Sequence, residues 1–371
     1  MKWRFTFPAL LALIVVLIEG CSSGKAAYKQ GDYYEAVLTA VQRLRQKPDH
    51  KKSREVLKLS YQQAVDYLES DAKNQIEANA NFKWRSAVQD YEKINRLYEE
   101  IRTSPGALKV IPKPISKYNE LTELKGKAAE ETYEAGIQAM MKDSRDDAKR
   151  AYFLFEEANG FSPGYREAIE MMDQAKFNAT LKVVVEPMIQ NMYDWNFDPV
   201  MFGYQGNMFV KFYTPRQAQE EGLEKIDHFT KLIVNGYSEG RPAITKKVES
   251  FKDSVKTGEK TVSGKKVPVY TNVTAQMTTY TKTVKARGSV TLLVVDASSR
   301  AELRNTEIAA DESWSDTWAT CTGDQRALSA ANKKLCEKRE PYMERDYLQK
   351  QTKRELDKKL ANAISSFYSR Y

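Results

Sequence analysis

The stretch KFNATLKVVV, residues 176–185, decides the fold because two kinds of sequence pattern meet in it. Over residues 26–175, apolar side chains recur at three- and four-residue spacing among many Ala, Glu, Lys and Leu residues, which predicts helices. Over residues 180–185, valine and threonine predict a strand. We therefore predict an α+β fold with two domains: an all-α domain over residues 21–176, then a mainly antiparallel β-sheet domain over residues 177–371 that ends in a helix.

A repeated motif organises the predicted helical domain. Residues 31–36 read GDYYEA, and Ala40 and Pro48 follow them. The glycine turns the chain between two helices, the alanines permit close helix contact, and the proline follows the second helix. This segment resembles the second half of a tetratricopeptide repeat, and weaker copies lie near Trp84 and Gly136. The residues expected to pack these repeats are Gly31, Tyr34, Ala36, Pro48, Trp84, Ala87, Gly136, Ala148 and Tyr152.

The spacing of the copies is irregular. The anchoring alanines Ala36, Ala87 and Ala148 are 51 and 61 residues apart, whereas tetratricopeptide repeats recur about every 34 residues. We therefore expect degenerate repeats, with a long helix over residues 53–80 and an insertion around residues 105–114. The alternative is an irregular helical bundle without repeats.

The second domain is expected to combine strands with one internal helix. Thr214 and the proline after it can start a helix over residues 215–227, and residues 229–235 predict a strand. Residues 252–266, rich in lysine and glycine, predict an exposed loop or hairpin tip. Residues 267–277 then alternate between apolar and polar side chains, which predicts one long strand with a buried face.

The last part of the chain is expected to close the sheet. Gly288 predicts a turn, residues 290–295 a short apolar strand, and residues 296–299 the next turn. From about Pro341 the pattern is helical again, and one apolar stripe predicts a helix docked on the sheet. This stripe consists of Leu348, Thr352, Leu356, Leu360, Ile364 and Phe367.

The first residues have the layout of an export signal. Lys2 and Arg4 precede an apolar run over residues 5–18, and Gly20 and Cys21 follow it. The run is shorter than the roughly 20 residues that a membrane-spanning helix needs. We therefore predict a signal peptide over residues 1–20 and no permanent transmembrane anchor.

The end of this signal resembles the bacterial lipobox, since Ile18-Glu19-Gly20-Cys21 has an aliphatic residue three places before the cysteine and a small residue just before it. The resemblance to envelope lipoproteins, including those of Bacteroidota, implies lipidation at Cys21. Because Ser22 follows in place of an aspartate, it also implies transport to the outer membrane, on its periplasmic side. The alternative is an ordinary cleaved signal with a chance cysteine.

The two other cysteines, Cys321 and Cys336, are near each other and can pair. In an oxidising compartment we expect them to form a disulfide. Two free thiols are the alternative.

The chain is basic, with a formal charge of +8 that becomes +7 when residues 1–20 are removed. Basic residues gather over residues 43–58, 246–266 and 350–359. They are suited to anionic lipid headgroups, an acidic partner or the cell wall, and solvated helix and loop faces are the alternative. The compartment disfavours nucleic acid as a partner.

Residues that carry chemistry are scarce. The two histidines, His50 and His228, exclude a histidine-rich metal site, and no Gly-x-Ser-x-Gly motif is present. His50 is expected at a helix end in a structural role. The nearest approach to a carboxylate cluster is Asp296, Asp311, Asp316 and Asp324, for which turn and capping roles are favoured. We therefore expect no enzyme, no cofactor and no metal.

These observations favour a non-enzymatic, membrane-anchored lipoprotein. Its acylated Cys21 holds membrane lipid, and its repeats bind an outer-membrane or periplasmic protein, as a scaffold or accessory subunit of an assembly or secretion complex. The alternative is a periplasmic lipoprotein that binds cell-wall fragments or another small molecule, with a pocket around residues 267–295, Trp314 and Trp318. An envelope hydrolase is the third hypothesis.

Overall fold

The computed structural model describes residues 23–188, 193 and 195–371. Cys21 and the signal segment lie outside these residues. The chain divides into two compact units at Ala179 and Thr180, and it combines an N-terminal helical region with a mixed sheet and a C-terminal helix, as predicted. Among the described residues no helix is both long and apolar enough to cross a membrane.

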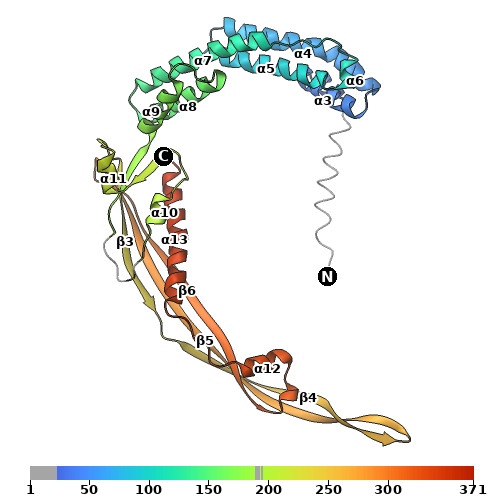
Figure 1. Ribbon diagram of the computed structural model, residues 1–371, viewed down its shortest axis with the longest axis vertical. Helices are drawn as coiled ribbons and strands as arrows, with labels where there is room; N and C mark the ends of the chain where they lie inside the picture. Colours follow the sequence, from blue (N-terminus) through green and yellow to red (C-terminus); the bar gives the residue numbers. More distant parts are fainter. Residues whose placement is uncertain (1–22, 189–192, 194) are drawn as a thin grey trace. The chain divides into compact units, whose positions relative to one another are not determined.

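The N-terminal unit is a succession of helices that follow one another along an arc (Figure 1). Each long helix packs on its neighbours in the chain, α3 on α4, α4 on α5, α5 on α7 and α7 on α8. The helices are α2 (Lys25–Lys29), α3 (Tyr33–Gln46), α4 (Lys51–Glu77), α5 (Lys83–Arg102), α6 (Pro105–Leu108), α7 (Tyr118–Met140), α8 (Arg145–Phe161) and α9 (Ala168–Ala179). Because α9 continues to Ala179, the division between the two units lies three residues after the expected boundary at residue 176.

Local sequence signals start these helices. The Asp32 side chain accepts a hydrogen bond from the backbone N–H of Glu35 at the start of α3, and Ser144 does the same for Asp147 at the start of α8. His50 caps the start of α4, with its Nδ1 atom 3.3 Å from the backbone nitrogen of Ser53. Its role is structural, as expected, but as an acceptor at the start of the next helix rather than as a cation at the end of the previous one.

The expected repeat-packing residues divide into buried and turn positions. The anchoring alanines Ala36, Ala87 and Ala148 are buried, and so is Tyr152. Tyr34 and Trp84 are half-buried against the core, and Pro48 is exposed beyond the end of α3. Gly31 has a φ of +80° in the turn before α3, a conformation that favours glycine.

Gly136 lies where α7 crosses α8. A Cβ atom at this position would be 2.7 Å from Cε1 of Phe155, whose side chain is fully buried. The two helices can approach this closely only because the residue has no side chain.

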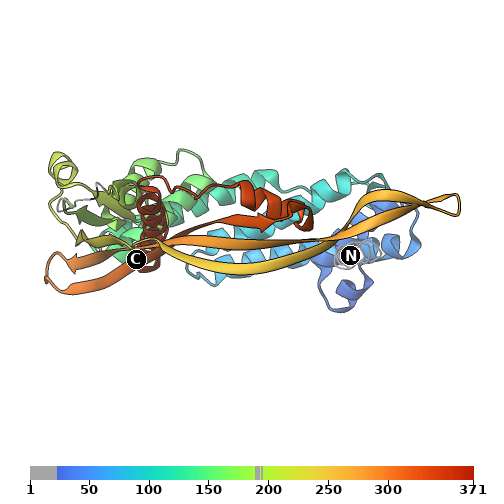
Figure 2. The ribbon, with the colours of Figure 1, turned by 90° about the horizontal axis from the view of Figure 1, so that it is seen from below.

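The second unit is built on one twisted six-stranded sheet, seen from two directions in Figures 1 and 2. Its strands are β1 (Leu181–Val185), β2 (Val210–Tyr213), β3 (His228–Glu239), β4 (Ala243–Val262), β5 (Lys265–Asp296) and β6 (Glu302–Gly323). The order is β2-β1-β3-β5-β4, and β6 also pairs with β5. Pairing is antiparallel throughout β3 to β6, whereas β1 is parallel to β2 and to β3.

Helices cover this sheet in different places. They are α10 (Asp198–Phe202), α11 (Pro215–Glu220), the short 3-10 helix η1 (Gln325–Ala327), α12 (Ala330–Glu337) and α13 (Tyr347–Tyr368). All six residues of the predicted C-terminal stripe are buried in α13, which packs on β5 and β6. The hydroxyl of Tyr368 also lies 3.0 Å from Oγ1 of Thr230 on β3. Helix α11 is shorter than expected because Gly222, at a φ of +62°, follows its end.

Strand β5 exchanges the face that it buries, and this exchange corrects two of our predictions. Val273, Ala275 and Met277 are buried on the face toward η1 and α12, whereas Val284 and Ala286 are buried on the opposite face beside α13. The strand is nevertheless continuous, so the turn predicted at Gly288 is wrong, and the short strand predicted over residues 290–295 is a part of β5 and not a separate element. A Cβ atom at Gly288 would be 2.8 Å from side-chain atoms of both Trp195 and Thr352, so close packing explains this glycine.

Of the two alternatives for residues 252–266, an exposed loop or a hairpin tip, the structure has the hairpin, and most of these residues are strand. β4 runs to Val262, and the turn consists of Ser263 and Gly264, with φ values of 52° and 77°. Two positive φ values suit a two-residue hairpin turn. Residues 296–299 do form the predicted turn: Oδ1 of Asp296 accepts hydrogen bonds from the backbone N–H groups of Ser298 and Ser299.

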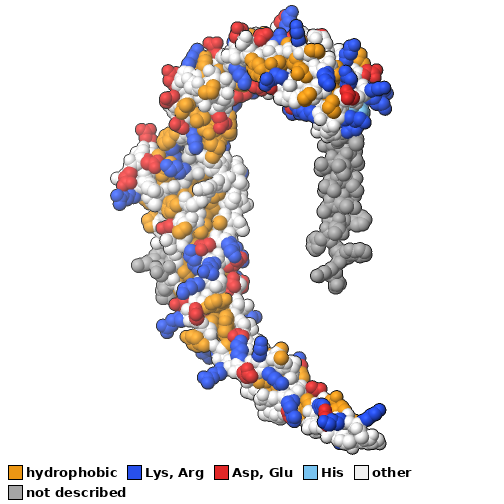
Figure 3. All heavy atoms as spheres, turned by 45° about the vertical axis from the view of Figure 1, so that its right-hand side comes forward, with side chains coloured by type: hydrophobic (Ala, Val, Ile, Leu, Met, Phe, Trp, Pro, Cys, Tyr) orange, Lys and Arg blue, Asp and Glu red, His pale blue; other side chains and the backbone are white. Residues whose placement is uncertain are grey.

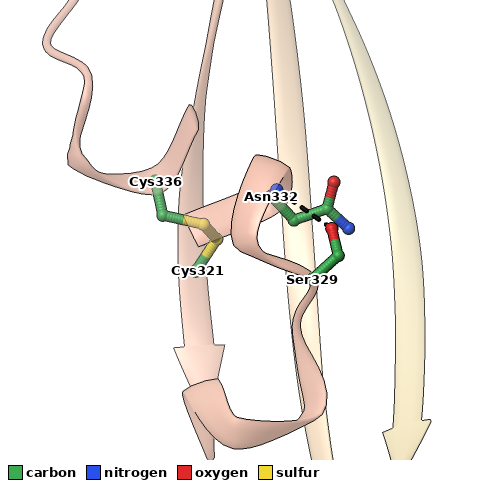
Figure 4. The surroundings of a disulfide bond; sticks show 4 residues. All are labelled: Cys321, Ser329, Asn332 and Cys336. Carbon is green, nitrogen blue, oxygen red and sulfur yellow. Dashed lines mark hydrogen bonds between the residues drawn. A yellow bond between two sulfur atoms is a disulfide. The ribbon is translucent and has the colours of Figure 1, made fainter. Parts of the chain in front are cut away.

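A disulfide attaches α12 to the sheet. Cys336 at the end of α12 is joined to Cys321 on β6, with their Cα atoms 5.7 Å apart (Figure 4). Both cysteines pack with Leu335 against the apolar cluster around Met277. The bridge therefore holds a short helix over a part of the sheet that α13 does not reach.

Replacing both Cys321 and Cys336 by serine is expected to lower the free energy of unfolding by up to about 3 kcal/mol, because the bridge closes a short loop and restricts the unfolded chain. Denaturant unfolding of the oxidised and the double-serine proteins measures the difference. Peptide mapping without reductant should first recover the two cysteines in one bridged fragment. Two alkylatable thiols in the mature protein would contradict this assignment.

Candidate protein-interaction site

The residues considered for chemistry serve structural roles. The ring of His228 is buried and faces Phe367 and Tyr371. The four carboxylates of the sheet unit each have a local partner: Asp296 accepts from turn residues, and the others pair with Arg287, Lys338 and Arg326. Within the described part of the chain, no group of three His, Cys, Asp or Glu residues is placed to hold a metal ion.

The two tryptophans of the sheet unit are packing residues. Trp318 on β6 stacks on Tyr280 of β5, with ring centroids 5.3 Å apart and planes inclined by 17°. Trp314 packs with Val284 beside Leu348, the first buried residue of α13. Both tryptophans therefore pack within the sheet unit, and neither forms a separate platform for a sugar or peptide under the disulfide-bonded helix.

A cavity of the helical unit lies where three helices meet. It has a volume of about 580 Å³ and is lined by residues at the start of α5, by one face of α7 and by the first turns of α8. We call it the α5–α7–α8 pocket. Its lining residues are Asn81, Phe82, Arg85, Glu131, Ala135, Gln138, Arg150 and Leu154.

An arginine and an aromatic ring form one wall of this pocket. The guanidinium carbon of Arg85 lies 4.1 Å from the ring centre of Phe82, and its terminal nitrogen pairs with Glu157. Burial raises the pKa of the Glu157 carboxyl, although the nearby Arg85 lowers it. Glu131 accepts a hydrogen bond from the backbone N–H of Trp84 at 3.2 Å. The wall thus combines an aromatic face with groups that can accept and donate hydrogen bonds.

Phe82 has an unusual backbone. Its φ of 59° and ψ of 36° place it in the left-handed region, although it immediately precedes α5. A bulky residue rarely adopts this conformation, which costs on the order of 1 kcal/mol or more. The strain positions the ring at the mouth of the pocket and against Arg85.

A second, smaller pocket occupies the equivalent place one repeat earlier. We call it the α3–α4–α5 pocket; it has a volume of about 290 Å³. Its lining residues are Gly31, Asp32, Tyr33, Tyr34, Ala64, Tyr67, Leu68 and Lys93. The space is enclosed in the same way as the larger pocket: by the start of α3, by one face of α4 and by part of α5.

The equivalence of the pockets extends to single positions. When the anchoring alanines of successive segments are aligned, Tyr34 of the smaller pocket corresponds to Arg85 of the larger one, and Lys93 corresponds to Leu154. Corresponding positions of the two segments therefore line both cavities, as would be expected of stacked helical repeats.

A third cavity lies in the sheet unit, with a volume of about 390 Å³. Val185, Trp195, Phe197, Met201 and Leu232 give it a mainly apolar lining. It is beside β1 and β3, and neither the two tryptophans of β6 nor the strand residues 267–295 line it. This cavity is therefore a different place from the pocket predicted around residues 267–295, Trp314 and Trp318.

Comparison with known proteins gives no relative. No protein-family model matches the chain, and no curated protein is similar enough to it to count as a match.

The residues that the sequence analysis singled out for repeat packing include few of the pocket residues. Gly31 and Tyr34 belong to both sets, and Trp84 and Ala87 lie near Arg85 without lining the cavity. The sequence did contain a signal for the pockets. Large side chains occur at Tyr67, Phe82 and Arg85, where the packing of helices against each other does not require them.

Proposed function

We propose that this protein is a non-enzymatic lipoprotein of the cell envelope, anchored through Cys21, whose helical unit holds a protein partner. The observation that carries the proposal is the pair of equivalent pockets at successive helix junctions. Two pockets at successive helix junctions suit an extended segment or helix of a partner better than a single small molecule. Such a protein would serve as an accessory subunit of an outer-membrane assembly or secretion machine.

The chemistry of the pocket walls supports a peptide-like partner. Aromatic residues and arginine are the side chains that contribute most at protein interfaces, and both occur here as Tyr67, Phe82 and Arg85. Tyr67 is 65% exposed, which leaves a large aromatic surface open for contact.

Filling the larger pocket is expected to abolish partner capture. Gln138 is exposed and lines the α5–α7–α8 pocket, so Gln138→Trp places an indole in the cavity without disturbing the core. The expected result is at least a tenfold loss of the partner that copurifies after crosslinking in the native envelope, because filling a central pocket costs about 2 kcal/mol or more. The matched control is Gln89→Trp, an exposed position of α5 that lines neither pocket.

Tyr67→Ala tests the smaller pocket in the same assay. Its side chain is mostly exposed, so the protein should unfold at nearly the same temperature as the wild type while partner recovery falls. Unchanged recovery in both Gln138→Trp and Tyr67→Ala would refute the proposal that the pockets hold the partner.

A second candidate function is small-ligand binding, because the sheet unit contains the apolar cavity beside β1 and β3. Its lining suits an apolar or aromatic compound in an orientation set by a few polar groups. Native mass spectrometry of the protein purified from envelopes would detect such a ligand. A bound compound, together with no loss of partner from the pocket variants, would favour this function over the scaffold.

A further inference from the structure

The β4–β5 hairpin has an end that pairs with no other strand of the described residues. β5 pairs with β6 only from Ala275 onward, so residues 265–274 pair with β4 alone. Every residue from 256 to 272 is exposed. An isolated two-stranded hairpin is at best marginally stable in water. The end of the hairpin, residues 256–270, is therefore suited to contact another molecule. We call these residues the hairpin tip.

The hairpin tip is strongly basic. Residues 256–266 contain four lysines and one carboxylate, Glu259. Glu259 pairs with Lys256, whereas Lys260, Lys265 and Lys266 form no ion pair with any residue that the structure describes. Three exposed, unneutralised cations within a few residues of one turn form a local positive field.

Apolar side chains lie among these lysines on both faces. The strand register places Val262, Val267 and Val269 on one face, where they are 47%, 40% and 36% exposed. The opposite face bears Pro268 and Tyr270, and Tyr270 is 59% exposed. Figure 3 shows basic and apolar side chains interspersed over this end of the sheet unit.

We propose that the hairpin tip inserts into the headgroup layer of a membrane that contains anionic lipids. Valine and tyrosine can enter the boundary between headgroups and acyl chains while lysines reach back to phosphate groups. A headgroup layer surrounds an inserted tip, which explains why both faces are apolar and basic. A protein partner would cover one face.

A second copy of this chain fits these features less well. The exposed edge of β4 could pair with another strand, but lysines along an edge oppose such pairing through charge repulsion. The membrane contact is independent of Cys21 and of the helical pockets, so it adds a second attachment to the one proposed above.

The test is vesicle flotation of the full mature chain carrying Cys21→Ser, which removes the acyl chains as a source of binding. Vesicles of phosphatidylcholine are compared with vesicles in which about one third of the lipid is phosphatidylglycerol. The expected result is binding to the anionic vesicles only, and weaker binding at high salt.

The decisive variant reverses the charges of the tip, as Lys260→Glu, Lys265→Glu and Lys266→Glu together. About 1 kcal/mol per lysine near an anionic surface is roughly a fivefold contribution to binding, so the triple variant should lose at least about a hundredfold. The control is Lys51→Glu, Lys52→Glu and Lys58→Glu, which makes the same charge change at exposed positions of α4. A second variant, Val262→Ser with Val267→Ser and Val269→Ser, keeps the charge and should still weaken binding.

Absence of binding to anionic vesicles would overturn the proposal. So would equal loss in the hairpin and α4 variants, which would assign binding to net charge. If the wild-type protein is instead a dimer in solution and the tip variants make it a monomer, the tip binds a second copy and the membrane assignment is wrong.

Discussion

The variant Gly136→Leu is expected to destabilise the helical unit by about 3 kcal/mol. Its first side-chain atom would be 2.7 Å from the ring of Phe155, which is fully buried and packs edge-on against Tyr133 with ring centroids 5.5 Å apart. The ring cannot move without opening the contact between α7 and α8, and overpacking of this kind typically costs 1–3 kcal/mol or more. Thermal or urea unfolding of the full chain measures the effect.

Gly126→Leu is the matched control in the same helix. A Cβ atom at Gly126 has no heavy atom within 4 Å, so this variant should gain about 0.5–1 kcal/mol from the higher helix propensity of leucine. If both variants change stability by the same amount and sign, Gly136 does not set the approach of α7 to α8.

The second large effect concerns attachment to the membrane. Changing Cys21 to serine removes the sulfur that would carry the lipid, and the protein should move almost completely from the membrane pellet to the soluble fraction. A multiply acylated cysteine meets the requirement for stable anchoring by itself, whereas a single chain gives only marginal binding. Fractionation of envelopes, followed by an alkaline wash, measures the change.

Cys321→Ser is a suitable control for this experiment, because it removes the disulfide and leaves Cys21 in place. It should remain with the membrane fraction. A Cys21→Ser protein that stays in the pellet after the alkaline wash would contradict lipidation. Weak residual attachment that high salt removes would be the contribution of the hairpin tip.

The sequence was most informative where one periodic pattern matched one element. The predicted stripe of α13, five apolar residues and Thr352, lies on one face of the helix, and all six residues are buried. The alternation over residues 267–277 likewise predicted a strand, but the predicted buried face is wrong for residues 267–272, which are exposed, and holds only for Val273, Ala275 and Met277. Such patterns are reliable where one face of an element packs against the same layer of neighbours along its length.

The same reasoning failed where a single element changes its neighbours. β5 buries odd-numbered residues up to Met277 and even-numbered residues from Val284 onward. In the sequence, this exchange of faces looks the same as the end of one strand and the start of another. The glycine at position 288 then suggests a turn. Only the packing of Trp195 and Thr352 over Gly288 explains why the strand continues.

Local sequence patterns also could not decide between a loop and a hairpin over residues 252–266, and they could not predict the pockets. Lysine and glycine in residues 252–266 indicated exposure correctly, but exposure does not distinguish a loop from a strand that lacks neighbours on both faces. The pockets depend on contacts between helices that are distant in the chain, and the irregular spacing of Ala36, Ala87 and Ala148 concealed the equivalence of the two cavities.

The central claim is that the helical unit holds a protein partner at the membrane, and crosslinking in the native envelope tests it most directly. Lysine-reactive crosslinking and mass spectrometry should recover one principal outer-membrane or periplasmic protein. Its crosslinks should fall on lysines of the helical unit, above all Lys93 in the α3–α4–α5 pocket, and they should disappear in Gln138→Trp but not in Gln89→Trp. Recovery of lipid and cell-wall fragments alone, or of a protein crosslinked only beyond Thr180, would contradict the account.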